Sequence, residues 1–394
     1  MSWALRNKVA IVGIGQTAFT KPGASGRSAF SLAIEATLGA CADAGVRPTD
    51  VDGFVTYGVE STDPYTLAET LGVEKTTFMD RYPGGGEGLA GVVHHAAMAI
   101  HAGVADTVVA YRSLSGRLYL GNSPEISAED DNGFFRKSFL FPFGVTVPAQ
   151  FYAMHARRHM IDFGTTSEQF GAYAVNQNRN AQRNPNAIHY GRPITVEDHQ
   201  SSRVVADPYR LYDCTQEADG ACAVVITGAE RAAGLPHKPA FVVAAAEGSG
   251  PSNHLYTQVR HQSRFNTAGF VEIAEDLYRR AGLGPSDMDV AQIFETFTGQ
   301  GMMALEDFGF CGRGESGPFV ESGSVGWPDG EVPINTAGGG LAEAYIHGFN
   351  NLVEGVRQLR GTSTSQVAGA STCLVTAGPG AMPSSALILA NEPR

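Results

Sequence analysis

The stretch INTAGGGLAEAYIHG, residues 334–348, holds the groups in this chain that most suggest chemistry. Three consecutive glycines, Gly338–Gly340, lead into a segment that the sequence predicts to be helical. Such a turn presents free backbone N–H groups to a negatively charged ligand. The stretch ends in Tyr345, Ile346 and His347, which no phosphate-binding loop requires. Three interpretations are open on this pattern alone: a nucleotide cradle, a catalytic turn, or a tight turn with only a structural role.

A second glycine triplet precedes another predicted helix, in the sequence GGGEGLAG of residues 84–91. A longer match accompanies the two triplets. Residues 43–52 (DAGVRPTDVD) and 280–289 (RAGLGPSDMD) share the pattern A-G-x-x-P-[ST]-D-x-D. Two matches in the same order along the chain indicate an internal duplication. Each half would then supply one glycine turn and one helix, and the two turns would meet at a central site.

The elements that would position these turns alternate along the chain. Residues 8–15, 51–58 and 106–114 are short apolar runs bounded by turn-forming residues, which predicts buried strands. Residues 28–45 and 88–103 have the apolar spacing of helices. This alternation predicts an α/β fold with a mainly parallel sheet and helices on both faces.

Residues 115–165 interrupt the alternation, because they are rich in aromatic, acidic and turn-forming residues. We interpret them as an excursion from the core. The sequence fits a lid or a partner surface as well as it fits a long ordered surface loop.

The composition of the 394-residue chain excludes several classes of protein. Its 28 basic and 40 acidic residues give a net charge of −12, which opposes broad nucleic-acid binding. The five cysteines form no CxxC pair, so we expect no metal site and reduced thiols in a cytoplasmic protein. No apolar run reaches the ~18 residues of a membrane span, and the N-terminus lacks the layout of a signal peptide.

Duplicated α/β halves with facing glycine turns resemble the thiolase superfamily over nearly the whole chain. The resemblance implies mixed sheets, an N-terminal half of residues 1–240 including the excursion, and a C-terminal half of residues 241–394. The segments that occupy the places of thiolase landmarks are SRVVADPYRLYDCTQEADGACAVVIT (202–227), IFETFTG (293–299), GGGLAEAYIHG (338–348) and TCLVTAGPG (372–380).

The sequence departs from the thiolases at four catalytic positions. The first turn, RYPGGGEGLAG of residues 81–91, has no cysteine to form an acyl-enzyme. Tyr345 stands in the place of the histidine, and Phe294 in the place of the His or Asn of the other loop. The base cysteine near residues 375–378 is missing as well, and Cys373 belongs to the preceding predicted strand. We therefore do not expect a Claisen-condensing enzyme.

The segment AEAYIHGFNNLVEGVRQLRGTS, residues 342–363, is similar in sequence to the corresponding segment of the thiolase-like steroid side-chain aldolases, which are often called lipid-transfer proteins. That resemblance implies a lyase that cleaves a β-hydroxyacyl-CoA without a cofactor, such as a 17-hydroxy steroid side-chain CoA thioester, into a ketone and propionyl-CoA. It implies a homodimer that forms a heterotetramer with a DUF35 protein, whose OB fold often carries a zinc ribbon. The family uses two tyrosines, one in the place of Tyr345 and one in the place of Phe294. Phenylalanine at this position could line an apolar pocket, or it could indicate a different substrate, an impaired enzyme or an engineered replacement.

A retro-aldol reaction needs a base for the β-hydroxyl proton and donors for the enolate. Backbone N–H groups at the start of a helix suit the second task, and the candidates lie in the two turns. Tyr345 is the candidate proton carrier, since the positive end of a helix favours a phenolate. The residues that we predict for the oxyanion site are Gly84, Gly85, Gly339 and Gly340.

Three further residues are secondary candidates. His347 lies two residues beyond Tyr345 and would point away from it on a helix, which favours a structural role. Glu295 could replace the missing acid, although adjacent side chains of a strand face opposite ways. Cys373 would matter only for acyl transfer. The alternatives to an aldolase are a non-catalytic acyl-CoA-binding or lipid-binding protein and, third, an acyltransferase or thiolase.

Overall fold

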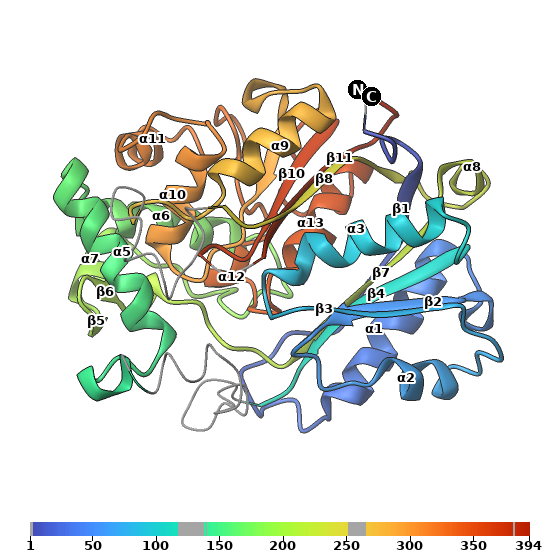
Figure 1. Ribbon diagram of the computed structural model, residues 1–394. Coiled ribbons are helices and arrows are strands. Elements are labelled where there is room, and N and C mark those ends of the chain that lie inside the picture. The colour runs from blue at the N-terminus through green and yellow to red at the C-terminus, as the bar shows by residue number, and fades with distance from the viewer. Residues whose placement is uncertain (1–2, 117–137, 139, 251–264, 381–382) are drawn as a thin grey trace.

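The computed structural model of the chain describes residues 3–116, 138, 140–250, 265–380 and 383–394 (Figure 1). Nine strands of these residues form one sheet in the order β3-β2-β4-β7-β1-β8-β11-β10-β9. The strands are β1 (Val9–Gln16), β2 (Gly53–Tyr57), β3 (Phe78–Tyr82), β4 (Thr107–Leu114), β7 (Gly220–Gly228), β8 (Ala240–Gly248), β9 (Val290–Gln292), β10 (Thr372–Ala377) and β11 (Ser384–Ala390).

The larger helices lie between these strands and in one long insertion. They are α1 (Ala29–Ala44), α2 (Pro64–Thr70), α3 (Gly88–His101), α5 (Pro148–Phe163), α6 (Ser167–Ala181), α9 (Val271–Ala281), α10 (Thr298–Asp307) and α13 (Phe349–Arg360). The short ones are α7 (Val196–Ser201), α8 (Ala229–Ala232), α11 (Ser316–Glu321) and α12 (Gly339–Ala342). Strands β5 (Val204–Ala206) and β6 (Tyr209–Arg210) form a separate pair.

The strand order confirms the predicted duplication. In the first repeat β1 pairs with β7 and β7 with β4, both antiparallel, and β4 pairs with β2 in parallel. In the second repeat β8, β11, β10 and β9 follow with the same succession of directions. The matched segments also correspond, because α1 and α9 both end at a left-handed glycine, Gly45 (φ 65°) and Gly282 (φ 64°). Residue 240 begins β8, and the boundary of two domains between residues 240 and 241 stays a prediction.

The sheet is mixed, as the thiolase resemblance implied, and the expectation of a mainly parallel sheet is wrong. Five of its eight strand pairs are antiparallel; the parallel ones are β2–β3, β2–β4 and β9–β10. The physical reason is the last strand of each repeat. A short connection joins β10 to β11, which only an antiparallel pair permits, and β7 takes the same place beside β4.

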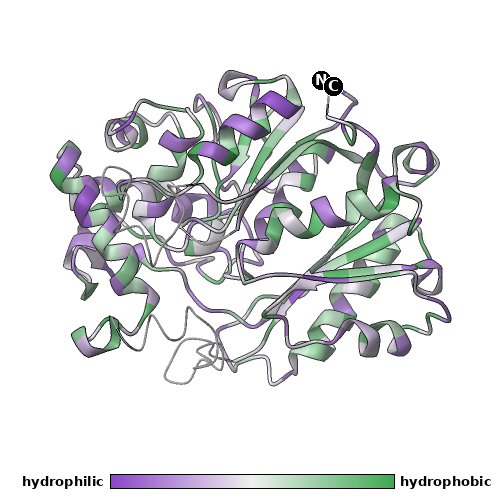
Figure 2. Cartoon of the chain, in the orientation of Figure 1, coloured by the Kyte–Doolittle hydropathy of each residue, from purple (hydrophilic) through white to green (hydrophobic). Residues whose placement is uncertain are grey.

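Helices α3 and α13 form a central layer between the strands of the first repeat and those of the second (Figure 1). The strands alternate accordingly: Cys222, Val224 and Ile226 of β7 pack in the core around α3 and α13, whereas the residues between them pack against α1. Apolar residues are concentrated in the strands and on the inner faces of the helices (Figure 2). Among the described helices, none is long and apolar enough to cross a membrane.

The predicted excursion of residues 115–165 contains a helix. Helix α5 occupies residues 148–163, where histidines and arginines interrupt the apolar spacing that would indicate a helix. The insertion continues through α6, α7, β5 and β6 before β7 begins at Gly220, so it is longer than we expected. Residues 117–137 and 139 lie outside the described residues, and a role of this region as a lid or partner surface stays a prediction.

The close packing of β1 on α1 leads to a first prediction. A Cβ at Gly15 would lie 2.0 Å from the carbonyl oxygen of Ala36 and 2.4 Å from the amide nitrogen of Ala40. We expect Gly15→Ala to lower the free energy of unfolding by about 1–3 kcal/mol, as overpacked cores do. Chemical denaturation measures this loss. In the control Gly234→Ala, the added Cβ has 3.8 Å to its nearest neighbour, so equal losses in the two variants would refute the prediction.

Candidate active site

The first glycine turn approaches the ring of Phe294, just after β9, and the second approaches the neighbouring Glu295. A Cβ on Gly86 would lie 2.6 Å from Cζ of Phe294, and one on Gly348 would lie 2.4 Å from its Cδ2. A Cβ on Gly85 would lie 3.5 Å from Cε1 of His347. Glycine is therefore required at positions 86 and 348, because any side chain there would displace the aromatic ring. The structure brings the first turn together with two of the predicted residues of the second half.

Tyr345 lies at the centre of this arrangement. Its ring stacks on Phe294 with centroids 5.9 Å apart and planes inclined by 22°. The ring of His347 meets it edge-on, at 5.1 Å and 83°. Tyr345 is almost buried, with 6% of its surface exposed, so its ring has one defined position between two aromatic neighbours.

The segment that carries Tyr345 is not the helix that the sequence predicted. Helix α12 is a single turn, Gly339–Ala342, and α13 begins only at Phe349. Gly338 (φ 114°) and Gly339 (φ 59°) are left-handed, as is His347 (φ 49°), and no helix runs through such residues. The expectation that a helix terminus favours the Tyr345 phenolate therefore does not apply. His347 also faces Tyr345 instead of pointing away from it.

The second glycine turn encloses the carboxyl group of Glu295. The amide of Leu341 donates to Oε1 of Glu295 at 3.3 Å, and Nδ2 of Asn335 donates to Oε2 at 2.8 Å. A Cβ on Gly339 would lie 2.5 Å from Oε1. Burial raises the pKa of Glu295 to about 8, although these hydrogen bonds oppose the shift. Gly339 and Gly340 thus form a cradle for a side chain of the protein itself, and their role towards an enolate stays a prediction.

Gly84 and Gly85 belong to the turn that faces the aromatic rings, before α3. Gly84 is left-handed (φ 85°), and a Cβ there would meet the carboxyl group of Glu87. Strand β11 packs against the residues that follow this turn, because Ser385 donates through Oγ to the carbonyl oxygen of Glu87 and accepts from the amide of Gly91 at 3.1 Å. The role of Gly84 and Gly85 as an oxyanion site stays a prediction.

Cys373 is not part of the aromatic site. It pairs with Val290 and Leu389 inside the sheet, and a Cβ on Gly355 of α13 would lie 3.0 Å from its sulfur. The thiol is fully buried, and burial raises its pKa far above the ordinary value. Such a thiol is a poor nucleophile, which weighs against acyl transfer at Cys373.

Sequence reasoning missed a buried charged group beside the site. Arg112 of β4 is 1% exposed; its Nη1 pairs with Oε2 of Glu60 at 3.1 Å and its Nη2 meets Nδ1 of His347 at 3.0 Å. Glu60 also accepts from the amide and hydroxyl of Ser113, both at 2.7 Å. One signal was present: an arginine inside the otherwise apolar run of residues 106–114 must find a buried partner.

Four other titratable groups gather where β3, α3 and β8 meet. His95 pairs through Nδ1 with Asp80 and through Nε2 with Glu247 at 3.4 Å, and Nδ1 of His94 lies 3.3 Å from the same carboxylate. The two carboxylates raise the pKa of His95 to about 9. In the part of the chain that the structure describes, no three His, Cys, Asp or Glu side chains are arranged to hold a metal ion.

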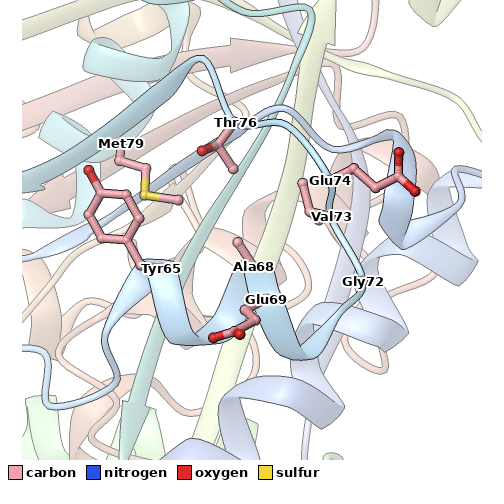
Figure 3. A pocket seen from close by; sticks show the side chains of 8 residues that line it. All are labelled: Tyr65, Ala68, Glu69, Gly72, Val73, Glu74, Thr76 and Met79. Carbon is pink, nitrogen blue, oxygen red and sulfur yellow. The ribbon is translucent and has the colours of Figure 1, made fainter.

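A surface pocket of about 350 Å³ lies between α2 and β3 (Figure 3). It belongs to the edge of the sheet, and none of its lining residues is a predicted site residue. They are Tyr65, Ala68, Glu69, Gly72, Val73, Glu74, Thr76 and Met79.

Several known proteins are similar to this chain in sequence and in fold. Residues 252–391 match the thiolase C-terminal domain-like family. The chain is 45% identical over 391 residues to the 17-hydroxy-3-oxo-4-pregnene-20-carboxyl-CoA lyase of Mycobacterium tuberculosis, covering 98% of this chain and 100% of the relative. It is 43% identical to a steroid side-chain-cleaving aldolase of Thermomonospora curvata, covering 98% of each. The solved structure of an Ltp2-ChsH2(DUF35) aldolase matches with a TM-score of 0.92 at 42% identity, covering 98% of each chain.

The raised pKa of Glu295 predicts how stability depends on pH. In the unfolded chain a glutamate loses its proton near pH 4.3, whereas folded Glu295 keeps it until about pH 8. The folded state therefore binds more protons between these values, and its stability falls as the pH rises through them. In Glu295→Gln this contribution is absent, so the free energy of unfolding should fall less steeply from pH 5 to pH 8.

Denaturant unfolding at several pH values measures the two slopes. A constant offset between the variant and the wild type is expected from the altered hydrogen bonds, and only the slope is diagnostic. The exposed Glu197→Gln serves as the control and should keep the wild-type slope. Parallel curves for wild type and Glu295→Gln would contradict the prediction.

Proposed function

The chain belongs to the thiolase-like family of steroid side-chain-cleaving aldolases, and we propose that it cleaves a β-hydroxyacyl-CoA with a bulky steroidal acyl group. The substrate would be a 17-hydroxy steroid side-chain CoA thioester, and the products a ketone and a short acyl-CoA such as propionyl-CoA. The observation that carries the proposal is the position of Tyr345, which packs on Phe294 and His347, the two rings that the cysteine-free first glycine turn approaches.

The proposed reaction needs one base and one group of donors. A base removes the β-hydroxyl proton, the bond between the α- and β-carbons breaks, and the β-carbon becomes the ketone carbonyl. The electron pair of that bond moves to the α-carbon as a thioester enolate, which then takes up a proton. No electrons leave the substrate, so the reaction requires no redox cofactor, and we propose that it uses none besides the CoA that the substrate carries.

We assign the proton transfers to Tyr345 and the enolate oxygen to the backbone N–H groups of Gly84 and Gly85. The first turn suits the enolate better than the second, because the amide after Gly340 already donates to Glu295. Donors that are fixed before the reaction stabilise developing charge without reorganisation. Phe294 would supply an apolar wall for the steroid where relatives are expected to carry the second tyrosine.

We further propose that the protein acts as a homodimer that binds a DUF35 protein, which together form a heterotetramer. The matched aldolase structure contains such a partner according to its name. Strand β3 ends the sheet, so its outer edge is available for pairing with a second copy of the chain. All five cysteines are free thiols, which fits a reducing compartment such as the cytoplasm.

Incubation of the protein and its DUF35 partner with a 17-hydroxy steroid side-chain CoA thioester tests the function. We expect ketone and propionyl-CoA in equal amounts, measured by liquid chromatography and mass spectrometry. In Tyr345→Phe the rate should fall at least ~100-fold, the usual contribution of a general acid or base. Affinity for the CoA thioester should change little, because the aromatic ring remains.

Tyr278→Phe is the matched control for this experiment. Its hydroxyl donates to the carbonyl oxygen of Phe308 at 3.0 Å, away from both turns, so the variant should cleave at the wild-type rate. If the wild type bound the thioester but released no ketone with the partner present, the protein would be a non-catalytic acyl-CoA-binding or lipid-binding member of the family.

Phe294→Tyr tests whether the apolar ring limits the reaction. The para carbon of Phe294 faces Gly86, so a hydroxyl at this carbon would lie beside the first turn, where it could donate to the substrate. We expect a higher kcat than in the wild type, measured in the same assay. An unchanged kcat in a variant of unaltered stability would mean that another group supplies the second proton transfer.

A further inference from the structure

The contact between Arg112 and His347 fixes the position of one proton. The two residues belong to different repeats, Arg112 to β4 and His347 to the segment between α12 and α13. Nη2 of Arg112 lies 3.0 Å from Nδ1 of His347, and both side chains are 1% exposed. A guanidinium group has donors only, so Nδ1 must be the acceptor. The imidazole is then neutral with its proton on Nε2.

Two further contacts hold His347, one to its backbone and one to its ring. The hydroxyl of Tyr57 in β2 donates to the carbonyl oxygen of His347 at 3.3 Å, and the rings of these residues are nearly parallel, at 8° and 6.4 Å. His347 is one of three residues other than glycine in the described structure with a positive φ, a conformation that persists only where the surroundings enforce it. The first repeat thus holds the segment of the second repeat that carries Tyr345.

Protonation of His347 would break the contact with Arg112. A second proton would make Nδ1 a donor that faces a guanidinium donor, and two cations would meet in a buried site. Burial, followed by the charge of Arg112, accordingly lowers the pKa of His347 well below its ordinary value. The charged or titratable groups around the imidazole are Arg112 with Glu60 behind it, Tyr57, Tyr345 and, behind Gly85 of the first turn, Glu87.

We propose that Arg112 keeps His347 as the neutral Nε2–H tautomer, and that this imidazole is a positioning residue that holds the ring of Tyr345 against Phe294. The inference rests on the proposed function in assigning Tyr345 to proton transfer, but the tautomer does not depend on it. Arg112 therefore acts on the reaction without touching the substrate, by preventing the protonation that would release Tyr345 from its edge-on neighbour.

Nuclear magnetic resonance of the protein with ¹⁵N-labelled histidine tests the tautomer directly. The signal of His347 is assigned as the one lost in His347→Gln, and His237→Gln, which removes an exposed histidine, checks the assignment. We expect a protonated Nε2 and an unprotonated Nδ1 from pH 5 to pH 8. A proton on Nδ1, or titration of His347 within this range, would overturn the proposal without any assay of activity.

Kinetics then separate positioning from a purely structural role. In Arg112→Met we expect kcat to fall by about 100-fold, the effect of a small misplacement, with little change in KM. A new loss of kcat/KM towards acid should also develop between pH 5 and pH 7, because the cation is gone and the carboxylate of Glu60 that remains favours a charged imidazole. The acid limb should disappear again in Arg112→Met/His347→Gln, which has no imidazole to titrate.

A second variant controls for a loss of activity through unfolding, because Arg112→Met leaves the buried carboxylate of Glu60 without a counter-charge. Arg112→Met/Glu60→Gln removes both charges, so burial alone keeps the imidazole neutral; we expect no acid limb, while kcat stays low because Nδ1 has lost its donor. A pH profile of folded Arg112→Met identical to the wild type, or a wild-type kcat in folded Arg112→Met/Glu60→Gln, would overturn the positioning role. If the wild type and its partner released no ketone at all, the proposed function would fail, while the tautomer measured by resonance would still decide this inference.

Discussion

The hydrogen bond from Arg112 to His347 is the contact on which the site depends. It joins β4 of the first repeat to the segment after α12 of the second, and it lies beside the place where the two glycine turns meet. Taking a guanidinium group out of water is costly, and the cost is offset only when a counter-charge and acceptors surround it. Glu60 supplies the charge, and the carbonyl oxygen of Val59 and Nδ1 of His347 supply further acceptors.

The duplication explains why two glycine turns meet, and the structure shows that they have diverged. In the first repeat, the turn before α3 approaches the rings of Phe294 and His347. In the second repeat, the turn before α12 closes on the carboxyl group of Glu295, and the amide of Leu341 already has an acceptor. The two turns thus differ: one lies beside the aromatic rings, and the other is an internal anchor. The anchor fixes the residue next to Phe294, so it also determines where that ring can lie.

Much of the fold could be predicted from the sequence, because the strands and helices follow local patterns of apolar residues and glycine. The bounds of β1, β2 and β4 agree with the predicted runs within two residues. The direction of β7 and β11 could not be found this way, since strand pairing depends on contacts far apart in the chain. The break after α12 was also hidden, because only the left-handed conformation of Gly338 and Gly339 reveals it. Arg112 was missed because its partners, Glu60 and His347, lie 52 and 235 residues away.

The contacts of Arg112 and of the first glycine turn explain how a thiolase-like site can function without a catalytic thiol. A thiolase cysteine must ionise, which favours positive charge beside the first turn. Here the buried cation, Arg112, is turned towards Glu60 and a neutral imidazole, and the first turn meets aromatic rings. Such surroundings suit an apolar substrate and protons that move over short distances. A reaction that breaks one carbon–carbon bond with two proton transfers, and with no covalent intermediate, is the chemistry that this arrangement best supports.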